Sequence, residues 1–376
     1  MQYDFDFRSR RSNVMAMHGM VASSQPLATL AGLDTLRAGG TAADAAVTVA
    51  AMLNVVEPFS TGVGGDCFAL YWDAKNKAVC ALNGSGPAAG SADLEALKRA
   101  GYDHFPYFTG QAVSVPGTVG AWTALLQRFG KMSLGEVLTP AIKYAKEGFP
   151  VSEWIGSGWK IMENHLLRKG EEKTAPKHMQ YPGPPQPSAH EFLIDGHAPK
   201  VGDRITLPTL GETLQELAAG GRDFFYTGDF AEKLCEYVQR YDGWLQPSDL
   251  AEFNAEWVEP IFTDYRDVRL YECPPNGQGL AAIIAAKIAN GFDLACMPPM
   301  QRTHTLIECM RLGFLEALQW VSDPHFLEIP YANLFSNPFI QSRRALIDPQ
   351  YAIKHLKINI NPMGDNTVYL SVVDGA

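Results

Sequence analysis

Thr367 is the residue of this chain whose neighbours most strongly suggest nucleophilic chemistry. It stands before residues 368–373, which are mostly β-branched, aromatic or aliphatic and predict a strand. Gly364-Asp-Asn366 precedes it and is typical of a turn. A threonine at the head of a new chain carries its own base, because its α-amino group, with a pKa of roughly 7.7–8.0, can accept the hydroxyl proton. Cleavage between Asn366 and Thr367 would therefore create a nucleophile.

The last residues, 367–376, raise the question of what completes this strand. Asp374-Gly375 is a dipeptide favoured in tight hairpin turns, yet no return strand follows it. A lone strand leaves its backbone N–H and C=O groups unpaired, so it must either add to an existing sheet or belong to a longer polypeptide. Of these two, we favour the longer polypeptide.

The composition is that of an ordinary globular enzyme, with 376 residues of which 46% are hydrophobic. A formal charge of −10 argues against nucleic acid or an anionic membrane surface as a partner, because both attract clustered Lys and Arg. The start of the chain is charged and lacks the apolar core of a secretory signal, and no run approaches the roughly 18 apolar residues of a membrane span. We therefore expect a cytoplasmic protein.

The cysteines and histidines do not form a metal-binding pattern. No Cys-x-x-Cys pair occurs, the histidines lack zinc-ligand spacing, and no acidic cluster follows the EF-hand pattern. We expect no metal and no cofactor. We interpret the six cysteines as buried free thiols: Cys67, Cys80, Cys235, Cys273, Cys296 and Cys309.

The first third predicts a layered unit of helix and sheet. Pro26 and Gly39-Gly40 mark the ends of a helix at about 26–38, and Thr41-Ala-Ala-Asp44 begins a second, almost wholly apolar helix that ends near Val56. The glycine-rich residues 60–66 then lead to two strands that we expect to pair, at 67–72 and 78–83.

The rest of the chain is mainly helical. The proline-rich residues 168–200 predict a long surface excursion, residues 266–273 a strand, and Gly279 the start of a helix. Because no clean boundary or repeat is present, one intertwined α/β domain is the economical interpretation. The other predicted helices lie near 119–129, 134–148, 151–167, 208–220, 229–241, 247–253 and 303–321.

Two glycine-containing loops could suggest ligand binding, but a structural role is the simpler explanation. Gly62-Val-Gly-Gly65 lacks the third glycine of a dinucleotide-binding loop, because position 67 is cysteine, and it lacks the Walker pattern. Pro274-Pro-Asn-Gly-Gln-Gly279 likewise reads as a turn. Glycine supplies positive φ at little cost, so we assign both loops to chain reversal.

A set of short motifs in a fixed order resembles the γ-glutamyltranspeptidase family of N-terminal-nucleophile hydrolases. The resemblance covers most of the chain, and its ending is similar to the family's processing site. The segments that resemble the family's large subunit are Gly19-Met-Val-Ala-Ser-Ser-Gln-Pro26, Ala31-Gly-Leu-Asp-Thr-Leu-Arg-Ala-Gly-Gly40, Asp44-Ala-Ala, Asn54-Val-Val-Glu-Pro58, Thr61-Gly-Val-Gly-Gly-Asp66, Val115-Pro-Gly-Thr118, Phe225-Tyr-Thr-Gly228 and Ser322-Asp-Pro324.

The resemblance implies a fold and an activity. The fold is the α/β class, a four-layer αββα sandwich that is incomplete without a small subunit. Residues 1–366 would be the large-subunit portion of one domain and 367–376 the first strand of the small subunit. After autoproteolysis, Thr367 would attack a small-molecule amide, and water or an amine would release the acyl group. The resemblance implies no cofactor, an inert isolated chain, and a heterodimer that could assemble further.

Three departures from the family pattern bear on substrate choice. The family commonly has Thr-Thr-His at the cut, whereas this chain has Thr367-Val-Tyr369 and so lacks the second hydroxyl. An arginine of the family grips the substrate α-carboxylate, and Ser85 stands in its place. Loss of such a charge-assisted pair costs roughly 1.5–3 kcal/mol. The family's Ser-Ser loop after a double proline is replaced by Asn276-Gly-Gln-Gly279.

These departures leave two alternatives to γ-glutamyl transfer. The first is an amidase of the same family with another acyl group, such as an oxamate amidohydrolase or a cephalosporin-acylase-like enzyme, and the missing arginine favours it. The second is a truncated or unprocessed chain without catalytic activity, which the abrupt end at Asp374-Gly-Ala376 favours.

Overall fold

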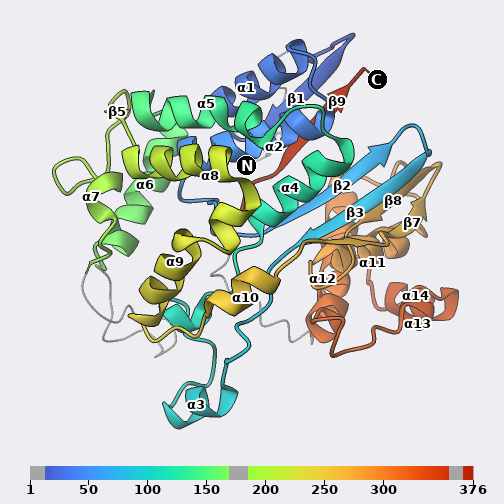
Figure 1. Ribbon diagram of the computed structural model, residues 1–376. Helices are drawn as coiled ribbons and strands as arrows, with labels where there is room; N and C mark the ends of the chain where they lie inside the picture. Colours follow the sequence, from blue (N-terminus) through green and yellow to red (C-terminus); the bar gives the residue numbers. More distant parts are fainter. Residues whose placement is uncertain (1–12, 169–184, 355–366, 376) are drawn as a thin grey trace.

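The computed structural model describes residues 13–168, 185–354 and 367–375 (Figure 1). It opens with strand β1 (Gly19–Ser23) and two packed helices, α1 (Pro26–Arg37) and α2 (Ala42–Val56). Gln25 caps α1 through its side-chain oxygen, which accepts from the N–H of Ala28 at 3.3 Å. The two helices predicted for this region are confirmed, with ends that differ by a residue.

The start of α2 is fixed by a buried carboxylate. Thr41 and Asp44 form the expected capping box, in which Asp44 accepts from the Thr41 N–H at 2.8 Å. The same carboxylate accepts from the N–H groups of Lys131 and Met132, at 3.0 and 3.2 Å. These residues join α4 (Thr118–Phe129) to α5 (Leu134–Glu147), so one acidic side chain ties three helices together.

Strands β2 (Cys67–Asp73) and β3 (Ala78–Gly84) form the predicted antiparallel pair, with Cys67 opposite Gly84. Strand β6 (Glu256–Val258) adds to the other edge of β3. A separate hairpin consists of β7 (Ile261–Tyr265) and β8 (Val268–Glu272). The sequence indicated only β8, because β7 follows β6 after two residues and the pair reads as one extended segment.

The predicted helices are present in the described residues, and one of them has a break. Helix α8 (Pro208–Tyr226) has non-helical geometry at Gly221, where φ is 63°, which explains why the sequence pattern ended at residue 220. The remaining elements are α3 (Leu94–Arg99), the short 3₁₀ helix η1 (Gly110–Ala112), β4 (Phe149–Pro150), α6 (Glu153–Leu166), α7 (Ala189–Phe192), β5 (Arg204–Ile205), α9 (Asp229–Gln239), α10 (Pro247–Glu252), α11 (Gly279–Ala289), α12 (Pro299–Trp320), α13 (Tyr331–Leu334) and α14 (Asn337–Arg344).

Buried apolar side chains gather in two clusters. The larger one is built around α2, α4, α5 and α8 and contains the fully buried Trp122 and Trp159. The smaller one joins α11 and α12 and includes Ile284 and Leu312. The single-domain assignment of residues 1–366 stays a prediction. Among the described residues, no helix is long and apolar enough to cross a membrane.

The final strand, β9 (Leu370–Asp374), runs antiparallel to β1, with Ser23 opposite Leu370 and Gly19 opposite Asp374 (Figure 1). The expected strand is thus present, and it pairs with an existing strand. Asp374 departs from its expected place in a turn. It ends the strand, and its carboxylate accepts from the N–H of Ala42 at 2.7 Å, at the start of α2.

Candidate active site

Thr367 lies exposed, three residues before β9 begins, and Asn366 lies outside the described residues. Exposure alternates along 367–374, as the two faces of a strand require. Val368, Leu370 and Val372 pack on the main core, and the intervening side chains face outward. The nucleophile proposed from the sequence is therefore on the outer face of the β1–β9 pair. That position leaves its hydroxyl open to a substrate.

Three glycine-containing segments meet near the end of β3. The carbonyl of Gly65 accepts from the N–H groups of Gly117 and Thr118, at 2.8 and 3.0 Å. A Cβ on Gly117 would lie 1.9 Å from the Gly84 carbonyl oxygen, and one on Gly86 would lie 1.6 Å from that of Val115. The backbones are thus too close for any side chain. This close approach explains the glycines at 84, 86 and 117. None of the glycines at 62, 64 and 65 has a positive φ, so the reason that the sequence suggested for that loop is not supported.

Tyr226 holds the second glycine segment in place. Its hydroxyl donates to the Pro116 carbonyl at 2.7 Å and accepts from the N–H of Gly120 at 2.9 Å, in the first turn of α4. Burial raises the pKa of this phenol far above its usual value. Tyr226 therefore stays protonated at neutral pH and serves as a support. The Phe225-Tyr226 motif was recognised in the sequence, but its role was not.

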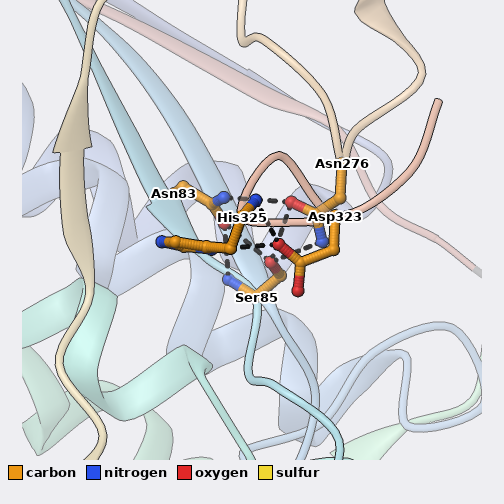
Figure 2. Close-up of polar contacts among 5 residues, drawn as sticks. All are labelled: Asn83, Ser85, Asn276, Asp323 and His325. Carbon is orange, nitrogen blue, oxygen red and sulfur yellow. Dashed lines mark hydrogen bonds and ion pairs between the residues drawn. The ribbon is translucent and has the colours of Figure 1, made fainter. Parts of the chain in front are cut away.

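Ser85 lies in a cluster of uncharged polar side chains (Figure 2). Its hydroxyl lies 2.7 Å from the Asn83 Oδ1 and accepts from the Asn276 Nδ2 at 2.9 Å. The Asn83 Nδ2 donates to the Asn276 Oδ1 at 3.0 Å, which closes the triangle. Asn83 is the second-last residue of β3, and Asn276 belongs to the loop between β8 and α11. Ser85 and the Asn276 loop, two separate departures from the family pattern in the sequence, thus belong to one hydrogen-bonded cluster.

Asp323 and His325, drawn with this cluster in Figure 2, follow α12. The Asp323 carboxylate accepts from the His325 N–H at 2.9 Å and lies 2.9 Å from its Nδ1. The Ser322-Asp-Pro324 motif thereby fixes a local turn through contacts between two exposed side chains. Among the described residues, no hydrogen bond or ion pair joins Ser85 to Thr367, so the sequence-predicted site residues are not brought into direct contact.

The cysteines are poor candidates for a nucleophile. Burial raises the pKa of Cys67 to about 12 and that of Cys273 to about 11, so both remain thiols at neutral pH. The expectation that all six are buried is wrong, because Cys67 and Cys80 are half-buried and Cys296 is exposed. In the described parts of the chain, no group of three His, Cys, Asp or Glu side chains could hold a metal ion.

Comparison with known sequences gives a consistent picture. A family model described as gamma-glutamyltranspeptidase matches residues 28–376. The glutathione hydrolase-like YwrD proenzyme of Bacillus subtilis is 31% identical over 365 residues, which are 96% of this chain and 65% of that protein. The oxamate amidohydrolase proenzyme of Klebsiella pneumoniae is 29% identical, over 97% of this chain and 66% of that protein. The chain therefore spans less than two thirds of the length of these relatives.

Solved structures resemble the whole chain. A cephalosporin acylase from Bacillus halodurans has a TM-score of 0.85 and 36% identity, and covers 100% of this chain and 67% of its own. The gamma-glutamyltranspeptidase of Helicobacter pylori has a TM-score of 0.81 and 25% identity, over 93% of this chain and 97% of that one. The predicted α/β fold of the N-terminal-nucleophile hydrolase type is confirmed by these likenesses.

Proposed function

This chain belongs to the gamma-glutamyltranspeptidase family, and from that premise we propose that the complete protein cleaves an amide bond through Thr367. The observation that carries the proposal is the place of Thr367. It is an exposed hydroxyl residue just ahead of a strand that is paired with β1 and capped on α2. A nucleophile needs both access to substrate and a fixed backbone, and this arrangement provides the two together.

Two chemical stages follow. In the first, the Thr367 hydroxyl attacks the carbonyl of Asn366, and the amide bond is replaced by an ester as the hydroxyl proton passes to the amide nitrogen, which becomes the free α-amino group. Water then hydrolyses this ester, which cuts the chain, leaves a carboxylate on Asn366 and restores the Thr367 hydroxyl. In the second, this amine takes the hydroxyl proton while the oxygen attacks the substrate amide. The acyl group then rests on Thr367 as an ester, and the amine of the substrate leaves with the proton. Water or an acceptor amine releases the acyl group and restores the hydroxyl.

We propose that residues 1–366 form the large-subunit portion of a processed enzyme and that a small subunit beginning at Thr367 completes it. An exposed apolar face on β2 supports this partner. Phe68, Leu70 and Trp72 alternate along the strand with exposed fractions of 37%, 41% and 57%. A strand face of this kind in an enzyme is suited to packing against further sheet.

The acyl group is the second part of the proposal. The cluster of Asn83, Ser85 and Asn276 presents amides and a hydroxyl without a cation among them. Such a site suits a neutral or small acyl group better than one with an α-carboxylate. An amidase for a non-γ-glutamyl acyl group, of the oxamate amidohydrolase or cephalosporin acylase kind, is therefore the second candidate function.

Mass spectrometry of a full-length version tests the nucleophile. We expect the wild-type chain to split between Asn366 and Thr367, and Thr367→Ala to remain whole and inactive. Thr367→Ser should still split, because it keeps the hydroxyl. A protein that turns over substrate while uncut, or an active Thr367→Ala variant, would contradict the assignment.

Assembly and location stay predictions from the sequence. We propose that the processed protein forms a homo-oligomer of heterodimers, and light scattering would measure its mass. We also propose a cytoplasmic location, which cell fractionation with a periplasmic or secreted control protein would test.

A further inference from the structure

Glu57 is a buried acidic residue that the proposed reaction leaves unused. It is 4% exposed and follows the last residue of α2, where its N–H donates to the Leu53 carbonyl at 2.9 Å. Its carboxylate accepts from the Ser24 hydroxyl at 2.6 Å, the one side-chain hydrogen bond that it makes among the described residues. A carboxylate is costly to bury without good partners, so a buried one that holds a single hydroxyl calls for an explanation.

Ser24 lies at the end of β1 from which the Thr367 segment departs. The last registered pair is Ser23 with Leu370, and Ser24 and Thr367 lie one and three residues beyond it in the two segments. Gln25 and Val368 face the core, whereas the side chains of Ser24, Tyr369 and Thr367 are all exposed. Ser24 and Thr367 are thus two exposed hydroxyl residues near the same end of the strand pair.

The hydrogen bond to Glu57 determines what Ser24 can offer to a neighbour. A serine hydroxyl has one proton and two lone pairs, and this proton is donated to the carboxylate. The oxygen can then only accept a further hydrogen bond. The freed amine of Thr367 needs such an acceptor, because its lone pair must point at its own hydroxyl while its N–H bonds point elsewhere. Val368, the next residue in the chain, has no hydroxyl that could accept this hydrogen bond.

We propose that Ser24 and Glu57 are positioning residues for the nucleophile of the processed enzyme. The Glu57 carboxylate holds the Ser24 hydroxyl, and the Ser24 oxygen accepts a hydrogen bond from the α-amino group of Thr367. The amine is thereby turned so that its lone pair faces the Thr367 hydroxyl. This inference rests on Thr367 being the nucleophile, and it adds a role for two residues of the large-subunit portion.

The order of events gives a test that separates positioning from mere stability. Self-cleavage precedes the free amine, so Ser24→Ala in the full-length protein should be cut to the wild-type extent. Turnover uses the amine, so kcat should fall about tenfold, the effect of one lost hydrogen bond, with KM within twofold. Ser24→Thr keeps the hydroxyl and should restore kcat.

Ser23→Ala is the matched control. Its hydroxyl also makes two hydrogen bonds, to the Gln25 carbonyl and to Thr29, and we expect kcat to be unchanged. Glu57→Met should lower kcat as Ser24→Ala does. If that variant does not fold, the serine variants decide alone. The inference is overturned if Ser24→Ala turns over like wild type, if it loses cleavage together with turnover, or if Ser23→Ala is equally impaired.

The roles of Thr367 and of Ser24 with Glu57 can be refuted separately. An active Thr367→Ala protein would remove the proposed function and this inference together. An inactive Thr367→Ala protein beside a fully active Ser24→Ala protein would remove only the roles of Ser24 and Glu57.

Discussion

At the scale of single residues, the proposed replacement of a family arginine by Ser85 has the clearest consequence for specificity. An arginine forms a bidentate, charged pair with a carboxylate, which a serine cannot do. We expect the complete enzyme to prefer a γ-glutamyl anilide over an analogue without the α-carboxylate by less than about a hundredfold in kcat/KM, the largest ratio that one such pair supplies. A larger preference would mean that another cation serves the carboxylate.

We expect Ser85→Arg to increase the preference of the enzyme for a γ-glutamyl substrate. The new guanidinium would stand between two amides, Asn83 and Asn276, that the hydroxyl now bridges. We expect the kcat/KM ratio of the two substrates to rise about tenfold or more in favour of the γ-glutamyl anilide. Ser91→Arg adds the same charge to an exposed position before α3 and serves as the control. An equal rise in both variants would point to overall charge rather than to this site.

Tyr226 is a second residue whose contribution can be measured. Tyr226→Phe removes the hydrogen bond to Pro116 and leaves the Gly120 N–H without its acceptor. Leaving a buried donor unsatisfied costs about 1–3 kcal/mol, so the free energy of unfolding should fall by that amount. Urea denaturation measures it, with Tyr351→Phe at an exposed position as the control. Equal stability of the two variants would refute the supporting role.

At the scale of elements, the sequence predicted what local chemistry determines. The Thr41–Asp44 capping box and the proline at the start of α1 set helix boundaries through contacts within a few residues. The pairing of β1 with β9 was not predicted, because it joins segments some 350 residues apart and no local signal encodes it. The sequence did not predict the hydrogen-bonded cluster of Asn83, Ser85 and Asn276, for the same reason. Long-range contacts follow from packing rather than from spacing.

The attachment of β9 to α2 can be tested at its polar end. The Asp374 carboxylate accepts from the Ala42 N–H at the positive end of the α2 dipole. Asp374→Ala in the full-length protein should lower the free energy of unfolding by about 1 kcal/mol, as loss of a helix cap does. Ser371→Ala, at an exposed position of the same strand, should leave it unchanged. A negligible effect of Asp374→Ala in urea denaturation would show that the cap is weak.

At the scale of the whole molecule, the proposal requires more than the 376 residues of this chain. We expect this chain by itself to show little amidase activity, because the small subunit that we propose to pack on β2 and to complete the active site is not part of it. Supplying the remaining segment, either in the same polypeptide or as a separate chain, should recover turnover. The rate of product release from an amide is the measurement, with Thr367→Ala as the blank. Robust turnover by this chain alone would contradict the two-subunit proposal.

Strand β9 is attached in two ways, by pairing with β1 and by the hydrogen bond from Ala42 to Asp374. These attachments have a further consequence once the chain is cut. Before the cut, covalent linkage keeps Thr367 at a high effective concentration next to its site, whatever the strength of local contacts. After the cut, the strand stays through its own association with β1 and α2, together with the proposed packing of the small subunit on β2. The β1–β9 pairing and the Asp374 hydrogen bond then help to keep the cut segment from dissociating when the protein is diluted. Weakening them should make the activity of the processed enzyme depend on protein concentration, while the uncut precursor would remain indifferent to it.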